Sequence, residues 1–411
     1  MKYQNSDEFF ISRTLTLAKK GAGFVSPNPL VGALVVKNGM IVGYGYHEKA
    51  GEPHAEINAL QKAGKQAIEA TLYVNLEPCS HFGKTPPCVE AIKKYGIKRV
   101  VAGILDPNSL VSGKGFKYLK ANGIEVKYGV LESEAKKLNE VFLKYITKKE
   151  PFVTIKIAVS LDGKIGYEKS FKNKEKFYLS SEESLEYVHY LRFINDGVMV
   201  SAKTVINDDP LLNIRYGKYG NRKKLHTKII LDPNLATPPD SKLFETGGKI
   251  LIFTSEDFDS LKKKKGELLE QKGAIIQKVY YNKLYNKLHN GLYLDLKQVF
   301  KICAEMGITS ILVETGRGLF GYLALNGLCD KLIVNVTPKI LGADGTIDIF
   351  DGVRLITGGS AEPVIKKDAP FSGSPKKKGY IAFTGLSVKK AGDDVFLTYY
   401  PGNIYTIPKI T

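Results

Sequence analysis

The chain of 411 residues lacks tryptophan, has only four cysteines, and contains no apolar run near the roughly 18 residues that a membrane-spanning helix needs. Its N-terminus also lacks the apolar stretch of a signal peptide, because Asp7 and Glu8 stand where that stretch would be. A cytosolic chain of this length does not depend on disulfides, so the question is whether any cysteine accompanies histidine and glutamate. These absences predict a cytoplasmic protein with no membrane partner.

Arginine is scarce in a chain that is strongly basic. The formal net charge is +18, yet only seven of the 60 basic residues are Arg. An excess of this size indicates an anionic partner, and its sign alone does not choose between nucleic acid, a membrane surface and a phosphorylated metabolite. Bidentate reading of bases depends on Arg, and Lys runs such as 262–265 are commonly solvated surface. We therefore expect no nucleic-acid partner.

Strand and helix signals alternate along the chain, which is typical of an α/β fold. Hydrophobic residues make up 43% of the chain, enough to bury a core, and this composition argues against disorder. Pro151 disfavours helix at the residue before it, so the long helix predicted over 132–145 has to end there. This break divides the chain into two predicted domains, 1–148 and 149–411.

The first domain is predicted to be a mixed sheet between helices. Ser6 can cap the first helix, and Asn38-Gly39 is the dipeptide favoured in a tight hairpin turn. Helices are expected over 6–20, 54–63, 87–95, 115–121 and 132–145, and strands over 30–37, 40–46, 71–76, 98–105 and 124–128.

The second domain is again predicted to alternate between strands and helices. Strands are expected over 152–160, 197–201, 228–231, 250–254, 310–314, 331–337 and 395–400, and helices over 182–195 and after Gly318. The Lys- and Tyr-rich stretch 262–290 carries no strong signal.

One histidine, one glutamate and two cysteines form the most specific pattern: His54, Glu56, Cys79 and Cys88. His and Cys are preferred zinc ligands, and three protein ligands leave a fourth position for water, as in catalytic zinc sites. The ligands lie near predicted helix starts, where the helix dipole favours thiolate. Zinc lowers the pKa of bound water toward neutral, and Glu56 can then move the protons. The pattern predicts one zinc per chain, with Glu56 as the catalytic residue.

Two other interpretations of these residues stay open. Isolated His and Cys residues are more often core or surface, although the four together count against a site without metal. A purely structural zinc usually has four protein ligands, and the nearby fourth candidate is His81. His47 is interpreted as a residue at the hairpin end or on the surface.

The motifs around these residues resemble the deaminase half of the bifunctional riboflavin-biosynthesis deaminase/reductases. They are PNPLVG at 27–32, GEPHAE at 51–56, EPCSHFGKTPPC at 77–88 and DPN at 106–108, in the family's order. Nucleobase deaminases in general carry H-x-E and P-C-x-x-C, and here the cysteines stand further apart. The resemblance implies a cytidine-deaminase-like α/β/α sandwich. It also implies that Asn28 holds the pyrimidine edge and that His81 belongs to the substrate pocket. Lys84, Asp106 and Asn108 would meet the ribose phosphate.

A glycine-rich sequence in the second domain, Glu314 to Gly321, contains G-x-G-x-x-G between a predicted strand and a predicted helix. Such a turn lets the backbone approach a pyrophosphate, but alone it is a weak signal because glycine turns are common there. No acidic residue ends a following strand about 20 residues on. Any dinucleotide-binding fold here is therefore not expected to be a Rossmann fold.

Further motifs resemble the reductase half of the same family: KIAVSLDGK at 156–164, SAKTVINDDPLL at 201–212 and TPKILG at 337–342. The resemblance implies a dihydrofolate-reductase-like α/β domain that uses NADPH. By position, the cofactor contacts would be Ala158, Thr204, Asp208, Gly316, Arg317, Gly318, Leu319, Phe320, Gly321 and Tyr322. The substrate contacts would be Arg192, Leu212, Arg215 and Glu314. The planar guanidinium of an arginine suits a sugar phosphate. The alternative is that these arginines form surface salt bridges.

The segment 168–179 departs from the family pattern, because it is longer and rich in Lys. Tyr178 takes the place of a cofactor-stacking Trp, in keeping with the absence of Trp from the chain. Lys176 stands where the family has a substrate-binding Ser, and a Lys could still hold a phosphate.

Together the resemblances cover about residues 6–400 and imply a two-step enzyme of riboflavin synthesis. Its steps would be the zinc-dependent hydrolytic deamination of 2,5-diamino-6-(5-phosphoribosylamino)pyrimidin-4-one and the NADPH-dependent reduction of the ribosyl group to ribityl. We also expect a homo-oligomer. One alternative is a tRNA or nucleic-acid deaminase, motivated by the basic charge. Another is a zinc-stabilised binding protein with a degenerate reductase half, motivated by the altered segment 168–179.

Overall fold

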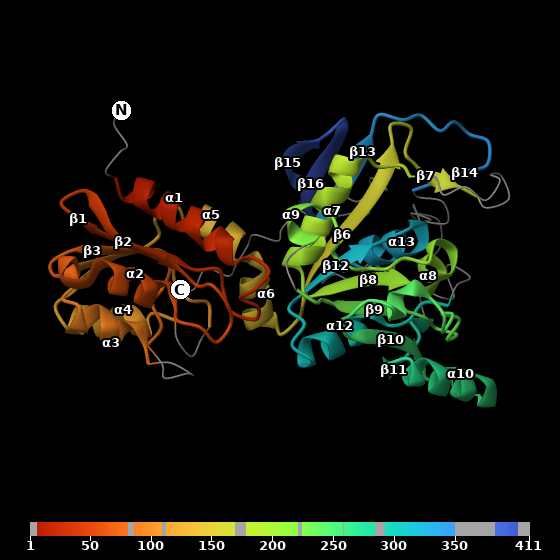
Figure 1. The fold of residues 1–411 in the computed structure, drawn as a ribbon, viewed down its shortest axis with the longest axis horizontal. Coiled ribbons are helices and arrows are strands. Elements are labelled where there is room, and N and C mark those ends of the chain that lie inside the picture. The colour runs from red at the N-terminus through yellow and green to blue at the C-terminus, as the bar shows by residue number, and fades with distance from the viewer. Residues whose placement is uncertain are drawn as a thin grey trace, which may run out of the picture. The chain divides into compact units, whose positions relative to one another are not determined.

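The structure is a computed structural model, and the chain divides into two compact units, Met1–Pro151 and Phe152–Thr411 (Figure 1). The residues that the structure describes are 6–80, 86–108, 112–168, 178–220, 224–257, 259–283, 292–349 and 383–401. Within these ranges, no helix combines the length and the apolar character that crossing a membrane requires.

The N-terminal unit is built on a five-stranded sheet in the order β2-β1-β3-β4-β5. Its elements are α1 (Asp7–Ala18), η1 (Lys19–Gly21), β1 (Gly32–Lys37), β2 (Met40–Tyr46), α2 (Ala55–Ala63), η2 (Gly64–Ala67), β3 (Thr71–Leu76), α3 (Cys88–Lys94), β4 (Arg99–Ile104), α4 (Lys114–Ala121), β5 (Glu125–Lys127), α5 (Glu132–Leu138) and α6 (Glu140–Lys148). β1 is antiparallel to β2 and β3, whereas β3, β4 and β5 are parallel. Helices α1 and α5 cover one face and α2, α3 and α4 the other (Figure 1). The predicted mixed sheet between helices is confirmed.

Local sequence signals account for several element boundaries. The Ser6 hydroxyl accepts a hydrogen bond from the backbone N–H of Phe9 and so caps α1. Asn38 and Gly39 both have positive φ, 51° and 76°, as a tight hairpin turn between β1 and β2 requires. Thr71–Leu76 forms β3 with the predicted bounds.

The single helix predicted over 132–145 is wrong, because Asn139 separates α5 from α6. This side chain is 2% exposed, and its amide oxygen accepts from the N–H of Leu30 while its amide nitrogen donates to the Leu30 carbonyl. Asn favours local alternatives to helix, and here its hydrogen bonds to a distant segment hold the break in place.

The C-terminal unit contains a nine-stranded sheet in the order β11-β10-β9-β8-β12-β6-β13-β16-β15. Its elements are β6 (Phe152–Ser160), β7 (Lys164–Tyr167), α7 (Glu182–Ile194), β8 (Gly197–Ser201), α8 (Ala202–Asp208), α9 (Gly217–Gly220), β9 (Thr227–Leu231), η3 (Lys242–Phe244), β10 (Ile250–Ser255), α10 (Ser260–Gln271), β11 (Ala274–Val279), α12 (Leu296–Glu305), β12 (Ser310–Glu314), α13 (Arg317–Leu325), β13 (Lys331–Thr337), β14 (Thr346–Asp348), β15 (Phe383–Ala391) and β16 (Asp394–Pro401). β16 is antiparallel to β13 and β15, and the other neighbours are parallel.

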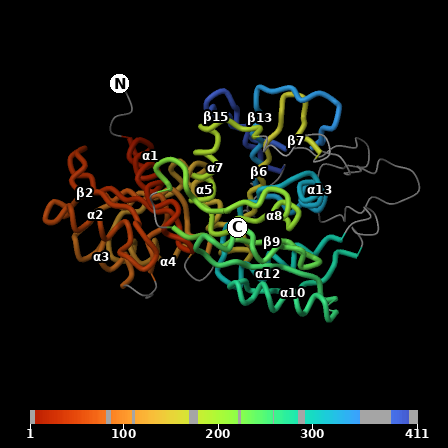
Figure 2. The backbone as a smooth tube through the Cα atoms, turned by 45° about the vertical axis from the view of Figure 1, so that its right-hand side comes forward, coloured from red at the N-terminus to blue at the C-terminus, as the bar shows by residue number. Residues whose placement is uncertain are grey.

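Both faces of this sheet are buried, which explains why its strands read as continuous apolar runs. Met199 and Phe253 belong to a core shared with α12 and α13, while Val200 and Ile252 point into a second core with α7 and α10. Beyond the sheet, β6 continues through a turn into β7, which pairs with β14 (Figures 1 and 2).

The stretch 262–290, which carried no strong sequence signal, contains most of α10 and all of β11. The Asp259 carboxylate caps α10 by accepting from the N–H of Lys262. Only Gly266 and Leu269 of this helix are buried, so its sequence lacks a clear apolar stripe.

Candidate active sites

Three side chains far apart in the sequence meet in the N-terminal unit, because two helices begin at the same place. His54 is the N-cap of α2, Cys88 is the first residue of α3, and Cys79 follows β3. The His54 Nδ1 atom lies 3.3 Å from the Cys88 Sγ atom and 3.5 Å from the Cys79 Sγ atom. All three ligand atoms lie within 4.8 Å of one another, and they are the cluster of possible metal ligands found among the described residues.

The separations among these three residues fit a zinc ion. A tetrahedral zinc with nitrogen at about 2.0–2.1 Å and sulfur at about 2.3 Å places nitrogen and sulfur about 3.6 Å apart. The observed separations of 3.3 and 3.5 Å are close to that value. The donor set, one imidazole and two thiols, is also the one that zinc prefers.

Hydrogen bonds among these three side chains shift the pKa values of two of them. The hydrogen bond with Cys88 is the main cause that lowers the pKa of Cys79 to about 4, and a hydrogen bond from His54 adds to it. The same contact with Cys79 raises the pKa of His54 to about 9. A metal ion held here would bind thiolate sulfur and a ring nitrogen that carries no proton.

Glu56, in the first turn of α2, is buried beside these residues with 3% of its surface exposed. Burial is the main cause that raises its pKa to about 7. A carboxyl group with a pKa near the working pH is well suited to both accept and release a proton.

His47 was missed as a site residue, since the sequence suggested a surface or hairpin-end position. It does follow β2, but it is 2% exposed and therefore not on the surface. Its Nε2 atom lies 3.0 Å from the Asn28 amide nitrogen, and its Nδ1 atom lies 3.2 Å from the Pro53 carbonyl. Its ring meets that of His54 edge to face, with centroids 5.4 Å apart. His47 thus links Asn28 to the neighbourhood of His54.

A buried carboxylate, Glu77, was also missed. Its two oxygens accept hydrogen bonds from the backbone N–H groups of Asp106, Gly113, Gly115 and Phe116. This side chain, two residues before Cys79, therefore ties the segment that carries Asp106 to the segment that carries Cys79. The Asp106 carboxylate in turn accepts from the N–H of Asn108. Three predicted substrate contacts, His81, Lys84 and Lys176, lie outside the described residues.

The C-terminal unit contains a cavity of about 1730 Å³ at the ends of β6, β8 and β12. Small-molecule pockets commonly measure about 300–1,000 Å³, so this cavity has room for a dinucleotide beside a second ligand. Of the predicted cofactor contacts, those that line it are Ala158, Tyr178, Thr204, Asp208, Gly316, Arg317, Gly318, Leu319 and Tyr322. Phe320 and Gly321 are buried on α13 and are not among the lining residues.

Four of the predicted substrate contacts, Arg192, Leu212, Arg215 and Glu314, line the same cavity. The Arg192 guanidinium bonds both oxygens of Glu314, at 2.5 and 2.7 Å. Burial raises the pKa of Glu314, but the charge and hydrogen bonds of Arg192 outweigh it and bring the pKa to about 2. Lys156, which was missed, also lines the cavity, and its burial lowers its pKa although Glu314 opposes that shift. This end of the cavity therefore carries more positive than negative groups.

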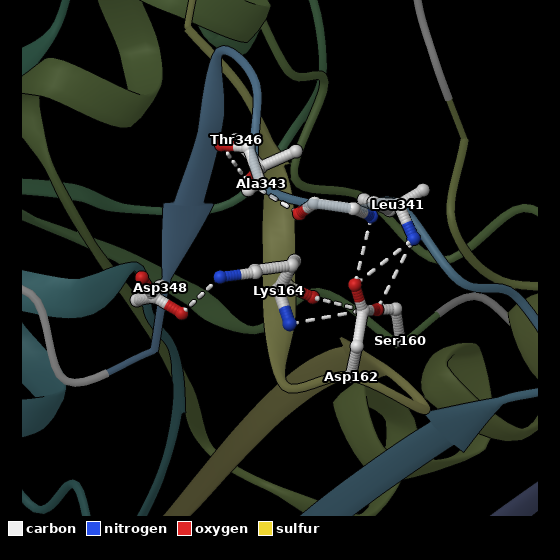
Figure 3. A network of polar contacts seen from close by, with 8 residues as sticks. Ser160, Asp162, Lys164, Leu341, Ala343, Thr346 and Asp348 are labelled. Atoms are coloured by element: carbon white, nitrogen blue, oxygen red, sulfur yellow. Dashed lines mark hydrogen bonds and ion pairs between the residues drawn. The ribbon is translucent and has the colours of Figure 1, made fainter.

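A small ribbon formed by β7 and β14 makes another wall of the cavity, to which it contributes Ile165 and Ile347. Asp162, in the turn before β7, accepts hydrogen bonds from the N–H groups of Leu341 and Gly342 and from the Ser160 hydroxyl (Figure 3). This carboxylate therefore fastens the base of the ribbon to the segment that follows β13.

Comparisons with known proteins agree with this division of the chain. Residues 4–104 match the family model described as the cytidine and deoxycytidylate deaminase zinc-binding region, and residues 151–364 match the RibD C-terminal domain. The riboflavin biosynthesis protein RibD of Aquifex aeolicus is 43% identical over 85% of this chain and 92% of its own length. The Escherichia coli protein of that name is 37% identical over 82% of this chain and 89% of its own length.

Solved structures give the same result over nearly the whole chain. RibD of Acinetobacter baumannii matches with a TM-score of 0.77 at 31% identity, covering 96% of this chain and 98% of that one. A Thermotoga maritima diaminohydroxyphosphoribosylaminopyrimidine deaminase/5-amino-6-(5-phosphoribosylamino)uracil reductase matches with a TM-score of 0.74 at 32% identity, covering 97% and 99%.

The fold and the two sites define an enzyme that joins a deaminase domain with a cytidine-deaminase-like fold to a reductase domain. The chain belongs to the RibD family of bifunctional deaminase/reductases of riboflavin biosynthesis. The nucleic-acid deaminase and the non-enzymatic binding protein, which the sequence left open, are not favoured by these matches.

Proposed function

We propose that the chain carries out two successive steps on one phosphorylated pyrimidine, with zinc held by His54, Cys79 and Cys88 and with NADPH in the large cavity. The substrates are those in the name of the Thermotoga relative: the diaminopyrimidine with a phosphoribosylamino group, and then the deaminated uracil. Because NADPH and sugar phosphates are intracellular metabolites, the proposal places the enzyme in the cytoplasm.

In the first step, the water oxygen bonds to the ring carbon that carries the amine, and the bond from that carbon to nitrogen breaks. Bound zinc supplies a Lewis acid that makes water a nucleophile at neutral pH. Glu56 takes a proton from the water and delivers it to the departing amine, so that ammonia leaves. Its pKa of about 7 suits both transfers. Asn28, oriented by His47, holds the pyrimidine edge, and Asp106 and Asn108 lie where the ribose phosphate would be held.

In the second step, C1′ of the opened ribose gains a hydride and the molecule takes up one proton, giving the ribityl chain. Bound NADPH would supply the hydride and would be oxidised to NADP⁺. No side-chain nucleophile is needed, so this half of the protein works by positioning. Gly316 is the N-cap of α13, and the backbone N–H groups there can receive the pyrophosphate. The basic side chains at the end of the cavity near Glu314, which include Arg215, receive the substrate phosphate.

The observation that carries this proposal is that the ligand atoms of His54, Cys79 and Cys88 lie within 4.8 Å of one another. These residues are far apart in the sequence, and one zinc ion bound by all three explains why they meet. The test supplies the diaminopyrimidine phosphate with and without NADPH and identifies the products by mass. Deamination changes the mass by about one unit and reduction adds about two more. A substrate that returns unchanged without NADPH contradicts the first step, and a deaminated product that NADPH leaves unchanged contradicts the second.

A further inference from the structure

The segment 212–215, between α8 and α9, borders the cation-rich end of the cavity in a conformation that needs outside support. Leu212 has a φ of 47°, in the left-handed region that a residue with a branched side chain rarely adopts. Its side chain is 1% exposed and belongs to the core beneath. Such a backbone persists only where neighbouring groups hold it.

Three buried side chains hold the backbone of this segment. An Arg192 guanidinium N–H donates to the Asn213 carbonyl at 2.9 Å, and the His226 Nε2 atom donates to the Leu212 carbonyl at 2.7 Å. The His189 Nδ1 atom accepts from the backbone N–H of Arg215 at 3.0 Å. Two of these groups, His189 and Arg192, come from one turn of α7.

Of the two arginines at this end, Arg215 is the one that can reach an anion. Arg192 is 8% exposed. Its Nε and Nη2 atoms donate hydrogen bonds to Glu314, and its Nη1 atom donates one to the Asn213 carbonyl. Arg215 is exposed, lines the cavity, and makes a single side-chain hydrogen bond to Asn213 in the described structure. Its guanidinium also lies over the Tyr216 ring, 5.2 Å from the centroid.

We infer that His189 is a positioning residue of the reductase: its neutral imidazole fixes the backbone of Arg215, so that the Arg215 guanidinium meets the phosphate of the substrate. This inference rests on the proposed function, because it takes the substrate phosphate as the anion. The imidazole has to accept through Nδ1, which it can do only while uncharged.

The surroundings of His189 keep it in that state. The side chain is 2% exposed, and its ring packs at a tilt against Tyr216 with centroids 4.9 Å apart. Burial lowers the pKa of His189 to about 3, and the charges of Arg192 and Arg215 add to the effect. A protonated ring would instead point an N–H at the N–H of Arg215.

The experiment measures the reduction of the deaminated intermediate with and without its 5′-phosphate, in the full chain. We expect His189→Leu to raise the KM for the phosphorylated substrate by roughly 10- to 100-fold, since a misplaced binding group commonly costs up to that much. The KM for NADPH, the turnover of the dephosphorylated substrate and the deaminase activity should stay the same. His189→Asn, which keeps a side-chain acceptor close to the Cβ atom, should recover most of the loss.

Leu191→Ala is the matched control, because Leu191 is buried on the same helix but is not among the residues that line the cavity. It should loosen α7 and leave the phosphate preference intact. A double-mutant cycle with Arg215→Gln then asks whether His189 acts through Arg215: in that background His189→Leu should change KM less than about twofold.

Equal losses for the two substrates, failure of His189→Asn to recover, or additive effects in the cycle would each overturn the inference. If His189→Leu no longer binds NADPH, His189→Met takes its place in the same comparison. If the wild-type chain reduces neither substrate, the proposed function itself fails. That result differs from failure of the inference alone, in which the wild type prefers the phosphorylated substrate and His189→Leu keeps the same preference.

Discussion

Glu56 combines near-complete burial with a position in the first turn of α2, next to His54, which we propose as a zinc ligand. Its pKa of about 7 lets one group take a proton and return it within a single turnover. Replacing it should therefore remove proton transfer while leaving the metal ligands in place.

We predict that Glu56→Gln keeps the zinc and lowers the rate of ammonia release by roughly 10²- to 10⁴-fold, the usual contribution of a general acid–base group. The reductase activity of the same chain should not change, which shows that the variant is folded. Glu52→Gln, at an exposed carboxylate of the preceding segment, is the control and should behave as the wild type. A Glu56→Gln variant that deaminates at the normal rate would remove Glu56 from the mechanism.

Two buried histidines make the stability of the C-terminal unit depend on pH. Burial is the main cause that lowers the pKa of His189 to about 3 and of His226 to about 4, below the unfolded value of 6.5. Between these values the unfolded chain binds protons that the native chain does not, so stability is complete above about pH 6.5 and falls as the pH falls. Each histidine should lower the free energy of unfolding at pH 5 by about 2 kcal/mol relative to pH 7.

Hydrogen exchange read by mass spectrometry on peptides of the C-terminal unit measures this effect separately from the N-terminal unit. His189→Asn should lose about half of the pH dependence between pH 7 and 5. Protection factors that stay constant over this range would contradict the neutral, buried state of the two rings.

At the residue scale, the sequence predicted the site residues that motifs and their spacing mark. It missed the residues whose role depends on hydrogen bonds to groups far away in the chain. His54, Cys79 and Cys88 could be grouped because they are the residue types that bind zinc, near predicted helix starts, and the structure brings them together. His47 and Glu77 form hydrogen bonds with Asn28 and Asp106, which come close to them only in the folded domain. No local sequence pattern therefore marks these two residues. The roles assigned to the individual site residues stay predictions.

At the scale of elements, the close approach of β2 and α2 places the metal site. Gly43 and Gly45 alternate along β2 and face α2, the helix that starts at His54. A Cβ atom at Gly45 would lie 2.6 Å from the Ala55 carbonyl oxygen and 2.5 Å from the Asn58 Cβ atom. The helix can pack this closely only against glycine.

Gly45→Ala should therefore destabilise the N-terminal unit by about 1–3 kcal/mol, the usual cost of overpacking. It should also weaken zinc binding, because α2 has to move and it carries His54. Titration with a competing chelator measures the affinity, and Ile41→Ala, at an exposed position of the same strand, is the control. Unchanged zinc affinity would show that α2 does not fix the ligand.

The ribbon of β7 and β14 is the element that Asp162 fastens at the edge of the cavity (Figure 3). The hydrogen bond from the Ser160 hydroxyl is the main cause that lowers the pKa of Asp162 to about 2, so the group is a carboxylate at working pH. Asp162→Asn replaces one acceptor oxygen by an N–H donor and should raise the KM for NADPH roughly threefold or more. Lys164→Gln, which removes only the ion pair with Asp348 on the ribbon, should have a smaller effect, and equal effects would contradict the role given to Asp162.

The elements that the sequence predicted well are those with local signals, such as the capped helix α1 and the Asn38-Gly39 hairpin. The single helix predicted over 132–145 was wrong because the decisive partner is distant: Asn139 ends α5 through its bonds to Leu30. No helix was predicted for α10, because few of its side chains are buried and its sequence therefore shows no apolar stripe.

At the scale of the whole molecule, the chain joins two units, one with the cluster of His54, Cys79 and Cys88 and one with a large cavity. Family membership explains why a deaminase and a reductase occur in one chain, and under the proposed function they act on successive forms of one compound. The basic charge of +18 agrees with phosphorylated ligands in both halves, and the expected homo-oligomer stays a prediction.

Inductively coupled plasma mass spectrometry of the purified full chain measures whether His54, Cys79 and Cys88 hold zinc with water in the fourth position. We expect one zinc per wild-type chain, none in His54→Ala, and one in His81→Ala, because the fourth position belongs to water and not to a protein ligand. A His54→Ala chain that keeps its zinc would show that His54 is not a ligand, and a His81→Ala chain that loses it would show that the site is a structural one with four protein ligands.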